Sequence, residues 1–455
     1  MSAEQREIAS LDWRGRGEPG GDLLIRGAHG FDPRSGLDRE CDIVVREGRI
    51  AVIAESGAGE LPEGGEELDA SGLHAFPAFF DPHVHLRTPG QEYREDIESG
   101  TRAAAAGGFC GIVAMANTDP VVDDPAIVAA LRERAETEAV VPTGFVATVT
   151  RGMDGRELSE MAALREAGAV GFSDDGLPVT DAGVMRRALQ YQHLVGGTIL
   201  LHEEDPALSG DGAMGEGAVS AALGLAGVPD VSESTMIARD GALCLYEDAR
   251  AHVQHLSARA SVEAVAVAKQ AGAKLTAELT PHHLVLTDEE VRSLDARFKM
   301  NPPLRTEDDR QALIEALRSG IVDCIGTDHA PHAPHEKEIP FEVANMGVTG
   351  LETAFAALYT ELVLPGVVDL GLIVERLGAG AELFDIAPSR LTPDAEADIA
   401  LVDLDSEWEA GADGWESRSV NSCFTGRRLR SRPVITIVAG TVAYRRREFT
   451  MKVAG

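Results

Sequence analysis

Cysteine is scarce in this chain, with five in 455 residues and no C-x-x-C pair among them. A disulfide framework and a zinc site built from cysteines are therefore not expected, and this usage is typical of the reducing cytoplasm. No apolar run approaches the roughly 18–20 residues that a membrane helix needs. The first twenty residues also lack the apolar segment of a signal peptide. We expect a cytoplasmic protein without a membrane span.

Positive charge is scarce as well. The sequence has 41 Lys and Arg residues against 75 Asp and Glu residues, for a formal net charge of -34. Phosphates would be repelled, so neither nucleic acid nor an anionic membrane surface is an expected partner. An anionic small substrate would need cations close by, because charges are screened beyond about 8 Å. Hydrophobic residues make up 44% of the chain, which is enough for a sizeable core.

The middle of the chain alternates between apolar, strand-like runs and helix-like segments. Helix-like segments such as 97–106, 157–167 and 261–271 each end at a glycine, which takes the left-handed conformation at little cost. Eight strand–helix units predict an α/β fold, a (β/α)8 TIM barrel over residues 75–388. The strand-like runs are Ala75–Phe80, Gly111–Met115, Gly144–Thr148, Ala169–Phe172, Thr198–Leu201, His252–His255, Leu275–Leu279 and Val322–Ile325.

Both ends of the chain show a different pattern, of short strands separated by turns. Such runs occur at 23–26, 42–46 and 49–53, and again at 398–403 and 433–438. We expect residues 21–74 and 389–455 to pair into one small β-sandwich domain beside the barrel. Residues 1–20 are expected to form a flexible tail.

Six side chains of metal-binding types fall where predicted strands end. In a (β/α)8 barrel, functional groups collect at the carboxyl ends of the strands. Residues i and i+2 of a strand point the same way, so the two histidines of His-x-His can share an ion. One histidine at a strand end would more often be a packing residue, but core packing does not explain six ligand types at successive strand ends. The set predicts a zinc-type centre and consists of His83, His85, Asp175, His202, His255 and Asp328.

The other histidines are not assigned to this centre. His29, His74 and His193 are interpreted as surface or packing residues, and His252 as a packing residue within a strand. For the pair at 282–283, hydrogen bonding to a ligand residue is as plausible as ligation. Near the exit of the eighth strand, His332 could reach a substrate and His335 is expected to be exposed.

Four sequence runs together resemble a type I dihydroorotase of the amidohydrolase superfamily. They are FPAFFDPHVHLRTPG at 76–90, GFSDDG at 171–176, KMNPPLR at 299–305 and TDHAPH at 327–332. The resemblance extends from about Asp22 to Ala443, whereas His-x-His alone would indicate only an amidohydrolase. It implies zinc-dependent, reversible hydrolysis of L-dihydroorotate to N-carbamoyl-L-aspartate in de novo pyrimidine (UMP) biosynthesis.

The resemblance also implies roles for individual residues. His83 and His85 would bind one zinc ion, with Asp328 near it as the proton shuttle. A second zinc ion in the same subunit would lie at His202 and His255, and Asp175 would bridge the pair. The implied substrate-binding residues are His85, Arg87, Asn117, Asn301, His332, Met346 and Gly347. Residues 330–346 would form a mobile loop over the site. The chain departs from the family pattern at Ala116, before Asn117, and at 333–335 in this loop.

Lysine is absent from the first 268 residues of the chain. Many cyclic-amide hydrolases of this superfamily bridge their metals with a carbamylated lysine at strand four. Here the first lysine is Lys269, and strand four is followed by Asp174 and Asp175. This weakens a hydantoinase, an allantoinase or a type II dihydroorotase as the interpretation.

Three alternatives remain open at this point. The chain could hydrolyse another cyclic amide, act as a non-catalytic homologue that scaffolds aspartate transcarbamoylase, or hold a purely structural metal. Arg87 could instead form a salt bridge to Glu92 or Glu95. Some type I members need aspartate transcarbamoylase for activity, so that enzyme is a candidate partner besides the small-molecule substrate, and a homo-oligomer is expected.

Overall fold

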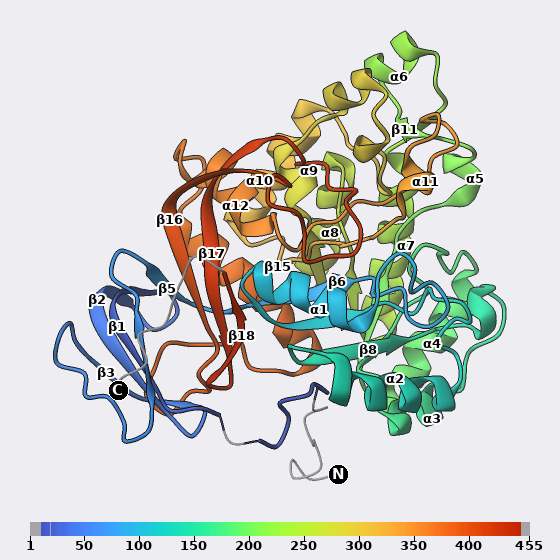
Figure 1. Ribbon diagram of the computed structural model, residues 1–455. Coiled ribbons are helices and arrows are strands. Elements are labelled where there is room, and N and C mark those ends of the chain that lie inside the picture. The colour runs from blue at the N-terminus through green and yellow to red at the C-terminus, as the bar shows by residue number, and fades with distance from the viewer. Residues whose placement is uncertain (1–10, 19, 447–455) are drawn as a thin grey trace.

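Eight short parallel strands form the predicted barrel (Figure 1). The computed structural model describes residues 11–18 and 20–446. A parallel bridge between Val84 and His329 brings the first strand beside the segment after the last one. In order around the barrel the strands are β6 (Phe79–Val84), β7 (Phe109–Ala114), β8 (Thr143–Ala147), β9 (Gly171–Phe172), β10 (Thr198–Leu201), β13 (Arg250–Val253), β14 (Lys274–Leu279) and β15 (Cys324–Ile325).

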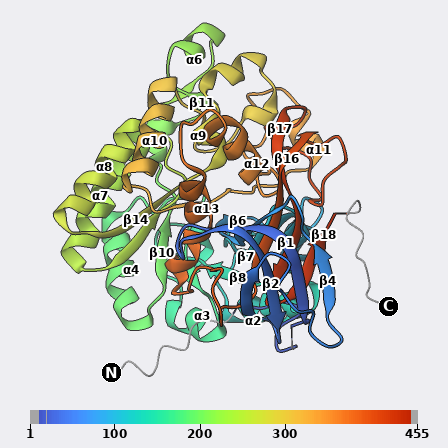
Figure 2. The same ribbon diagram turned by 90° about the vertical axis from the view of Figure 1, so that its left-hand side faces the viewer.

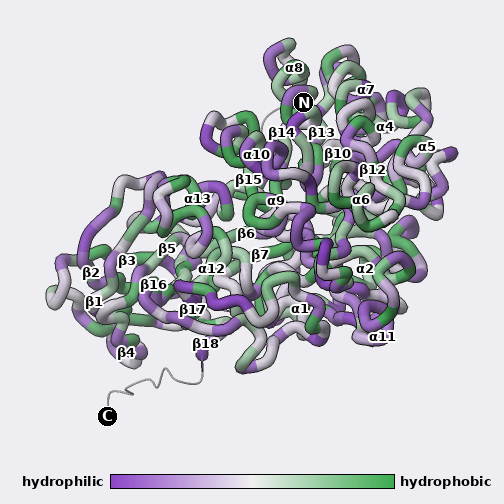
Figure 3. Tube along the Cα trace, turned by 90° about the horizontal axis from the view of Figure 1, so that it is seen from above, coloured by the Kyte–Doolittle hydropathy of each residue, from purple (hydrophilic) through white to green (hydrophobic). Residues whose placement is uncertain are grey.

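Helices cover the outside of the barrel, which explains why its strands are continuous apolar runs. Every residue of β7 and β8 is buried. Hydrophobic and hydrophilic residues alternate along the covering helices α7 and α8 (Figure 3). The longer helices are α1 (Ile97–Ala106), α2 (Pro125–Glu138), α3 (Met161–Ala167), α4 (Ala182–Val195), α7 (Val231–Glu247), α8 (Arg259–Ala271), α10 (Glu307–Ser319) and α13 (Leu370–Gly378).

Shorter elements lie in the connections. The short helices are α5 (Pro206–Ser209), α6 (Ala218–Leu223), α9 (Pro281–Val285), α11 (Pro334–Lys337) and α12 (Ala354–Leu358). Strands β11 (Met214–Gly215) and β12 (Gly227–Val228) pair with each other. Single 3-10 or π turns occur at Arg151–Met153, Asp288–Ser293, Ala296–Phe298, Tyr359–Val363 and Ala379–Phe384.

Strands from both ends of the chain join in a second sheet, as predicted (Figure 2). The two ends meet where β5 pairs antiparallel with β16, for example at Phe76 and Ala400. Ile25, Ile43 and Ile399 belong to a hydrophobic core of this sheet. Its strands are β1 (Leu23–Asp32), β2 (Leu37–Arg46), β3 (Arg49–Glu55), β4 (Glu66–Asp69), β5 (His74–Pro77), β16 (Ile399–Glu409), β17 (Arg428–Val438) and β18 (Thr441–Arg445).

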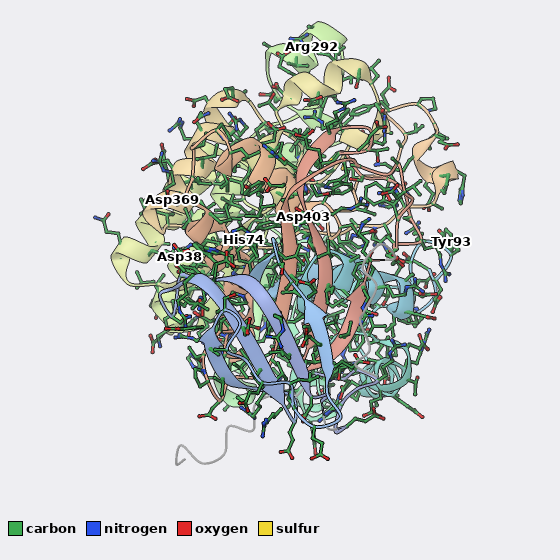
Figure 4. All side chains as sticks on the ribbon, turned by 60° about the vertical axis from the view of Figure 1, so that its left-hand side comes forward. Asp38, His74, Tyr93, Arg292, Asp369 and Asp403 are labelled. Carbon is green, nitrogen blue, oxygen red and sulfur yellow. The ribbon has the colours of Figure 1, made fainter. Side chains whose placement is uncertain are left out.

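Two of the histidines that were interpreted as surface or packing residues lie on this sheet. The rings of His29 and His74 are 4.8 Å apart. His29 Nε2 is 2.7 Å from Asp38 Oδ1. Figure 4 labels His74 and Asp38 beside the strands of this sheet.

The first predicted strand, Ala75–Phe80, is in fact two strands. The chain changes hydrogen-bond partners between residues 78 and 79: the amide of Ala78 donates to Asp398, and the amide of Phe79 donates to Gly108. Residues up to Pro77 therefore belong to the end sheet, and the barrel begins at Phe79. As a consequence, His83 lies within β6 and not beyond it.

Two other expectations need correction. The expected flexible tail is wrong for residues 11–13, because Asp12 and Thr143 exchange backbone hydrogen bonds and Trp13 is buried; residues 1–10 lie outside the described residues. The expected helix at 157–167 begins at Met161, since the amide of Ser159 bonds to Val149 and Glu157 accepts from Arg151. The domain boundaries stay a prediction.

Candidate metal centre

The six predicted ligands converge at the carboxyl ends of the barrel strands. Each of the six residues is at most 6% exposed. They come from β6 and the segments that follow β6, β9, β10, β13 and β15, so five separate strands contribute. The convergence follows from the barrel, in which parallel strands end on the same face.

Asp175 lies at the centre of the group. Its Oδ1 is 3.7 Å from His83 Nε2, 3.5 Å from His202 Nδ1 and 3.6 Å from His255 Nε2, and its Oδ2 is 3.5 Å from His85 Nε2. These distances are long for hydrogen bonds. They resemble the roughly 3.3–3.5 Å between ligand atoms that surround one zinc ion at about 2.0–2.1 Å.

The geometry contains two groups of three ligands that share Asp175. One group is His83, His85 and Asp175, and the other is Asp175, His202 and His255; within each group the ligand atoms lie within 4.8 Å of one another. Two imidazoles and a carboxylate are a donor set that suits zinc. Asp328 lies next to the first group, with Oδ1 3.1 Å from His85 Nε2 and 3.6 Å from His83 Nε2. The residues present therefore fit a pair of metal ions.

Both carboxylates are anionic in this environment. Burial acts to raise the pKa of Asp175, but its close contacts with the imidazoles of His202, His255 and His83 outweigh burial and hold the pKa well below its ordinary value. Burial also acts to raise the pKa of Asp328, but the hydrogen bond with His85 and the nearby histidines outweigh it and lower the pKa to about 2. The centre thus presents negative charge to a cation.

Three residues of the site have left-handed backbone conformations that side chains other than glycine rarely adopt. The φ angles are 56° at Arg87, 33° at His255 and 48° at Asp328. Such conformations cost about 1–3 kcal/mol each and persist only where the surrounding structure holds them. At these three residues the backbone conformation sets the direction in which the side chains project at the mouth of the barrel.

Arg87 lies at the same mouth and is 7% exposed. Its Nε donates to the carbonyl of Pro331 at 3.1 Å. Burial lowers its pKa to about 10, so the side chain remains cationic at neutral pH. In the part of the chain that the structure describes, Arg87 forms no ion pair with Glu92 or Glu95, which was the open alternative.

The other predicted substrate-binding residues also surround the centre. Asn117 hydrogen bonds through Oδ1 to His85 Nδ1 at 2.8 Å and donates from Nδ2 to Asp175 Oδ2 at 3.2 Å. Asn301 Nδ2 donates to Glu204 Oε2 at 2.7 Å. Asn117 therefore contacts two of the predicted ligands, and a bond from His85 Nδ1–H leaves His85 Nε2 available to a metal.

His332 and the backbone near residue 346 form another part of the mouth. His332 Nε2 is 2.7 Å from the carbonyl oxygen of Met346, and the amide of Gly347 donates to Lys299 at 3.0 Å. Burial lowers the pKa of His332 to about 3, so a neutral ring donates this bond. Lys337 Nζ donates to three carbonyls, those of Lys299, Asn345 and Gly347, at 2.8–3.0 Å. These contacts hold both ends of the 330–346 segment, whose mobility stays a prediction.

Sequence reasoning missed three residues that contact the site. Glu204 Oε2 lies 3.2 Å from His202 Nε2, and its place two residues after His202 could have indicated this. Asn421 accepts from the amide of His332 and donates to the carbonyl of Gly347, both at 3.1 Å, with no sequence signal to place it there. Glu278 hydrogen bonds to His83 Nδ1 at 2.7 Å; a carboxylate inside an apolar strand was the available signal.

Within the pair at 282–283, the partners of His283 are not predicted metal ligands. His283 is hydrogen-bonded at both ring nitrogens, to Thr280 Oγ1 at 2.8 Å and to the carbonyl of Pro302 at 3.0 Å. It therefore acts in hydrogen bonding and is not free to bind a metal. The His282 ring is also buried, and its Nε2 has no partner within the described residues.

Comparisons with known proteins agree with this geometry. Residues 74–261 match the family described as dihydro-orotase-like. The chain is 43% identical over 424 residues to the dihydroorotase of Geobacter sp. (strain M21), covering 93% of this chain and 99% of that protein. It is 44% identical over 426 residues to the dihydroorotase of Geobacter metallireducens, covering 93% and 100%.

A solved structure gives the same result for the fold. The L-hydantoinase (dihydropyrimidinase) from Arthrobacter aurescens superposes with a TM-score of 0.83 at 25% identity, covering 95% of this chain and 98% of that one. Within the described residues no helix has the length and apolar character to cross a membrane. The near full-length matches confirm the resemblance seen in the sequence, and the chain belongs to the dihydroorotase family.

Proposed function

We propose that this protein is a zinc-dependent dihydroorotase, which interconverts L-dihydroorotate and N-carbamoyl-L-aspartate in de novo pyrimidine biosynthesis. The observation that supports this most is the carboxylate of Asp175, which two pairs of histidines share, with a buried arginine at the same mouth. A ring amide that carries a carboxylate suits both features.

The proposed metal ligands are His83 and His85 for one ion and His202 and His255 for the other, with Asp175 between them. The chemistry that bound zinc supplies is the acidity that makes hydroxide available from water near pH 7, together with polarisation of the ring carbonyl. Two ions per subunit agree with the two groups of ligands, each of which is complete with three protein side chains.

Asp328 is the proposed proton shuttle. It is an anionic carboxylate beside His85 and His83, on the side of the first ligand group. In ring opening it takes the proton of the attacking water and passes it to the leaving ring nitrogen. In ring closure the same group must begin protonated, so lower pH favours closure and higher pH favours opening.

Arg87 is the proposed clamp for the substrate carboxylate. Its Nε is already bound to the carbonyl of Pro331, which fixes the plane of the guanidinium and leaves both terminal NH2 groups for the carboxylate. Because the protein carries a formal net charge of -34, an anionic substrate needs a cation of this kind within the site. His332, Asn117, Asn301 and the backbone at 346–347 complete the proposed substrate site.

One experiment separates this proposal from its alternatives. Purified protein is analysed for metal and assayed with dihydroorotate, hydantoin and allantoin, with and without aspartate transcarbamoylase. We expect zinc-dependent turnover of dihydroorotate in preference to the other two rings. Equal or greater turnover of hydantoin or allantoin would indicate another cyclic-amide hydrolase, and no turnover under either condition would indicate a scaffold. The cytoplasmic location, the homo-oligomer and the transcarbamoylase complex belong to the same proposal.

A further inference from the structure

A buried carboxylate lies directly beneath the candidate metal centre. Glu278, within β14, is 0% exposed. Its Oε1 is 2.7 Å from His83 Nδ1, and its Oε2 is 3.1 Å from His252 Nε2. The opposite ring nitrogen of His83, Nε2, faces Asp175 and Asp328. One histidine thus connects the carboxylate to the predicted ligands.

This contact decides which nitrogen of His83 carries a proton. A carboxylate accepts hydrogen bonds, so His83 Nδ1 must be the donor. The lone pair of a neutral ring is then on Nε2, which is the atom that faces the centre. A negative charge at Nδ1–H also increases the electron density that Nε2 offers to a cation.

The charge on Glu278 is stabilised by its surroundings. Each of its carboxylate oxygens is hydrogen-bonded to an imidazole nitrogen, Oε1 to His83 Nδ1 and Oε2 to His252 Nε2. His252 is itself held by a 2.9 Å hydrogen bond between its Nδ1 and Thr276 Oγ1. The sequence-based interpretation of His252 as a packing residue therefore needs an addition, because both of its nitrogens are hydrogen-bonded.

The backbone also makes room for this carboxylate. A Cβ atom at Gly326 would lie 2.7 Å from Glu278 Oε2 and 3.0 Å from its carboxyl carbon. Glycine at 326, just after β15, is what allows the side chain of Glu278 to extend across the barrel interior. The position of the carboxylate is thus fixed from three strands.

We infer that Glu278 is a positioning residue for the metal centre, whose anionic carboxylate orients His83 and strengthens it as a ligand. This inference rests on the proposed function in one respect, namely that His83 binds an ion. Glu278 has no proposed contact with substrate or metal.

A second metal site at this place is a weaker explanation. Glu278, His252 and Cys324 also form a buried group whose ligand atoms lie within 4.8 Å. However, His252 Nε2 and Glu278 Oε2 are hydrogen-bonded to each other, and burial raises the pKa of the Cys324 thiol well above its ordinary value. A neutral thiol and an imidazole that is already paired are poor ligands.

The test measures zinc binding to metal-free protein by competition with a chromophoric chelator, without any substrate. Glu278→Gln keeps the shape and one acceptor atom but removes the charge, and Glu278→Leu removes the acceptor as well. We expect zinc to bind about 10-fold more weakly to E278Q and about 100-fold more weakly to E278L, the range found for such partners of metal-bound histidines. The loss should mainly affect the ion at His83, because Glu278 is hydrogen-bonded to the ring of His83, whereas it contacts His255 only through the backbone amide, at 3.4 Å.

Glu233→Gln is the matched control. Glu233 is also a buried glutamate, 4% exposed, and accepts from the amide of Ser257 at 2.9 Å; among the described residues it has no hydrogen bond to a predicted ligand. E233Q should bind zinc as the wild type does. Circular dichroism verifies that each variant is folded. If E278L does not fold, the zinc affinity of E278Q alone tests the inference.

Wild-type zinc affinity in folded E278Q would overturn the inference, as would an equal loss in E233Q. These results are separate from failure of the proposed function. If wild-type protein binds zinc and does not hydrolyse dihydroorotate, the proposed function fails while the role of Glu278 is still tested by zinc binding.

Discussion

The sharpest test of substrate choice is the replacement of Arg87 by methionine, which keeps a long apolar stem and removes the charge. In the structure Nε of Arg87 donates a hydrogen bond to the carbonyl of Pro331, so a substrate carboxylate would bind to the two terminal NH2 groups. A hydrogen bond to a charged group contributes about 1.5–3 kcal/mol. Two such bonds that share one carboxylate, and are therefore not additive, give about 3 kcal/mol in total, or roughly a 100-fold change.

We expect R87M to lower kcat/KM for dihydroorotate by about 100-fold, mainly through KM. The control is the substrate dihydrouracil, which has the same ring without the carboxylate. Steady-state kinetics on both compounds should show the loss for dihydroorotate and little change for dihydrouracil. A similar loss for both rings would mean that Arg87 supports the fold of the mouth, and no loss for either would refute the clamp.

The remaining predictions concern the centre and the loop. Asp328→Ala should reduce turnover by about 10²–10⁴-fold while metal analysis finds wild-type content; full activity would refute the shuttle. Asp175→Asn should lower the content of both ions, because both groups share this carboxylate, and wild-type content would contradict that geometry. Burial lowers the pKa of Lys337 from 10.5 to about 7 in the folded protein. Between these two pH values the unfolded chain binds more protons than the folded one, so the free energy of unfolding of the wild type rises with pH. Lys337→Met should remove this pH dependence. Urea unfolding at several pH values measures this slope, and an unchanged slope in K337M would refute it.

Much of the barrel was predictable because its strands and helices are encoded by local patterns. Helix α1 begins and ends where the sequence predicted: the side chain of Asp96 caps its start and glycine follows its end. The six predicted ligands were visible because strand periodicity places His83 and His85 on one face and because carboxyl ends of parallel strands meet at one edge.

Other features had no local signal. Nothing within Ala75–Phe80 shows that its first residues pair with β16 and its last with β7, because that choice depends on strands far away in the sequence. Asn421 reaches the mouth from a segment more than seventy residues beyond Met346, and only the folded chain brings them together.

The residue types and their spacing thus determined the barrel, the class of metal centre and the family of this chain. The tertiary structure decided what supports that centre. Its supports are the carboxylate of Glu278 behind His83, the left-handed backbone at Arg87 and Asp328, and the hydrogen bonds from Lys337 Nζ at the end of the 330–346 segment. The physical reason is that periodicity is a property of neighbouring residues, whereas the partner of a buried charge is chosen by packing between strands that are distant in sequence.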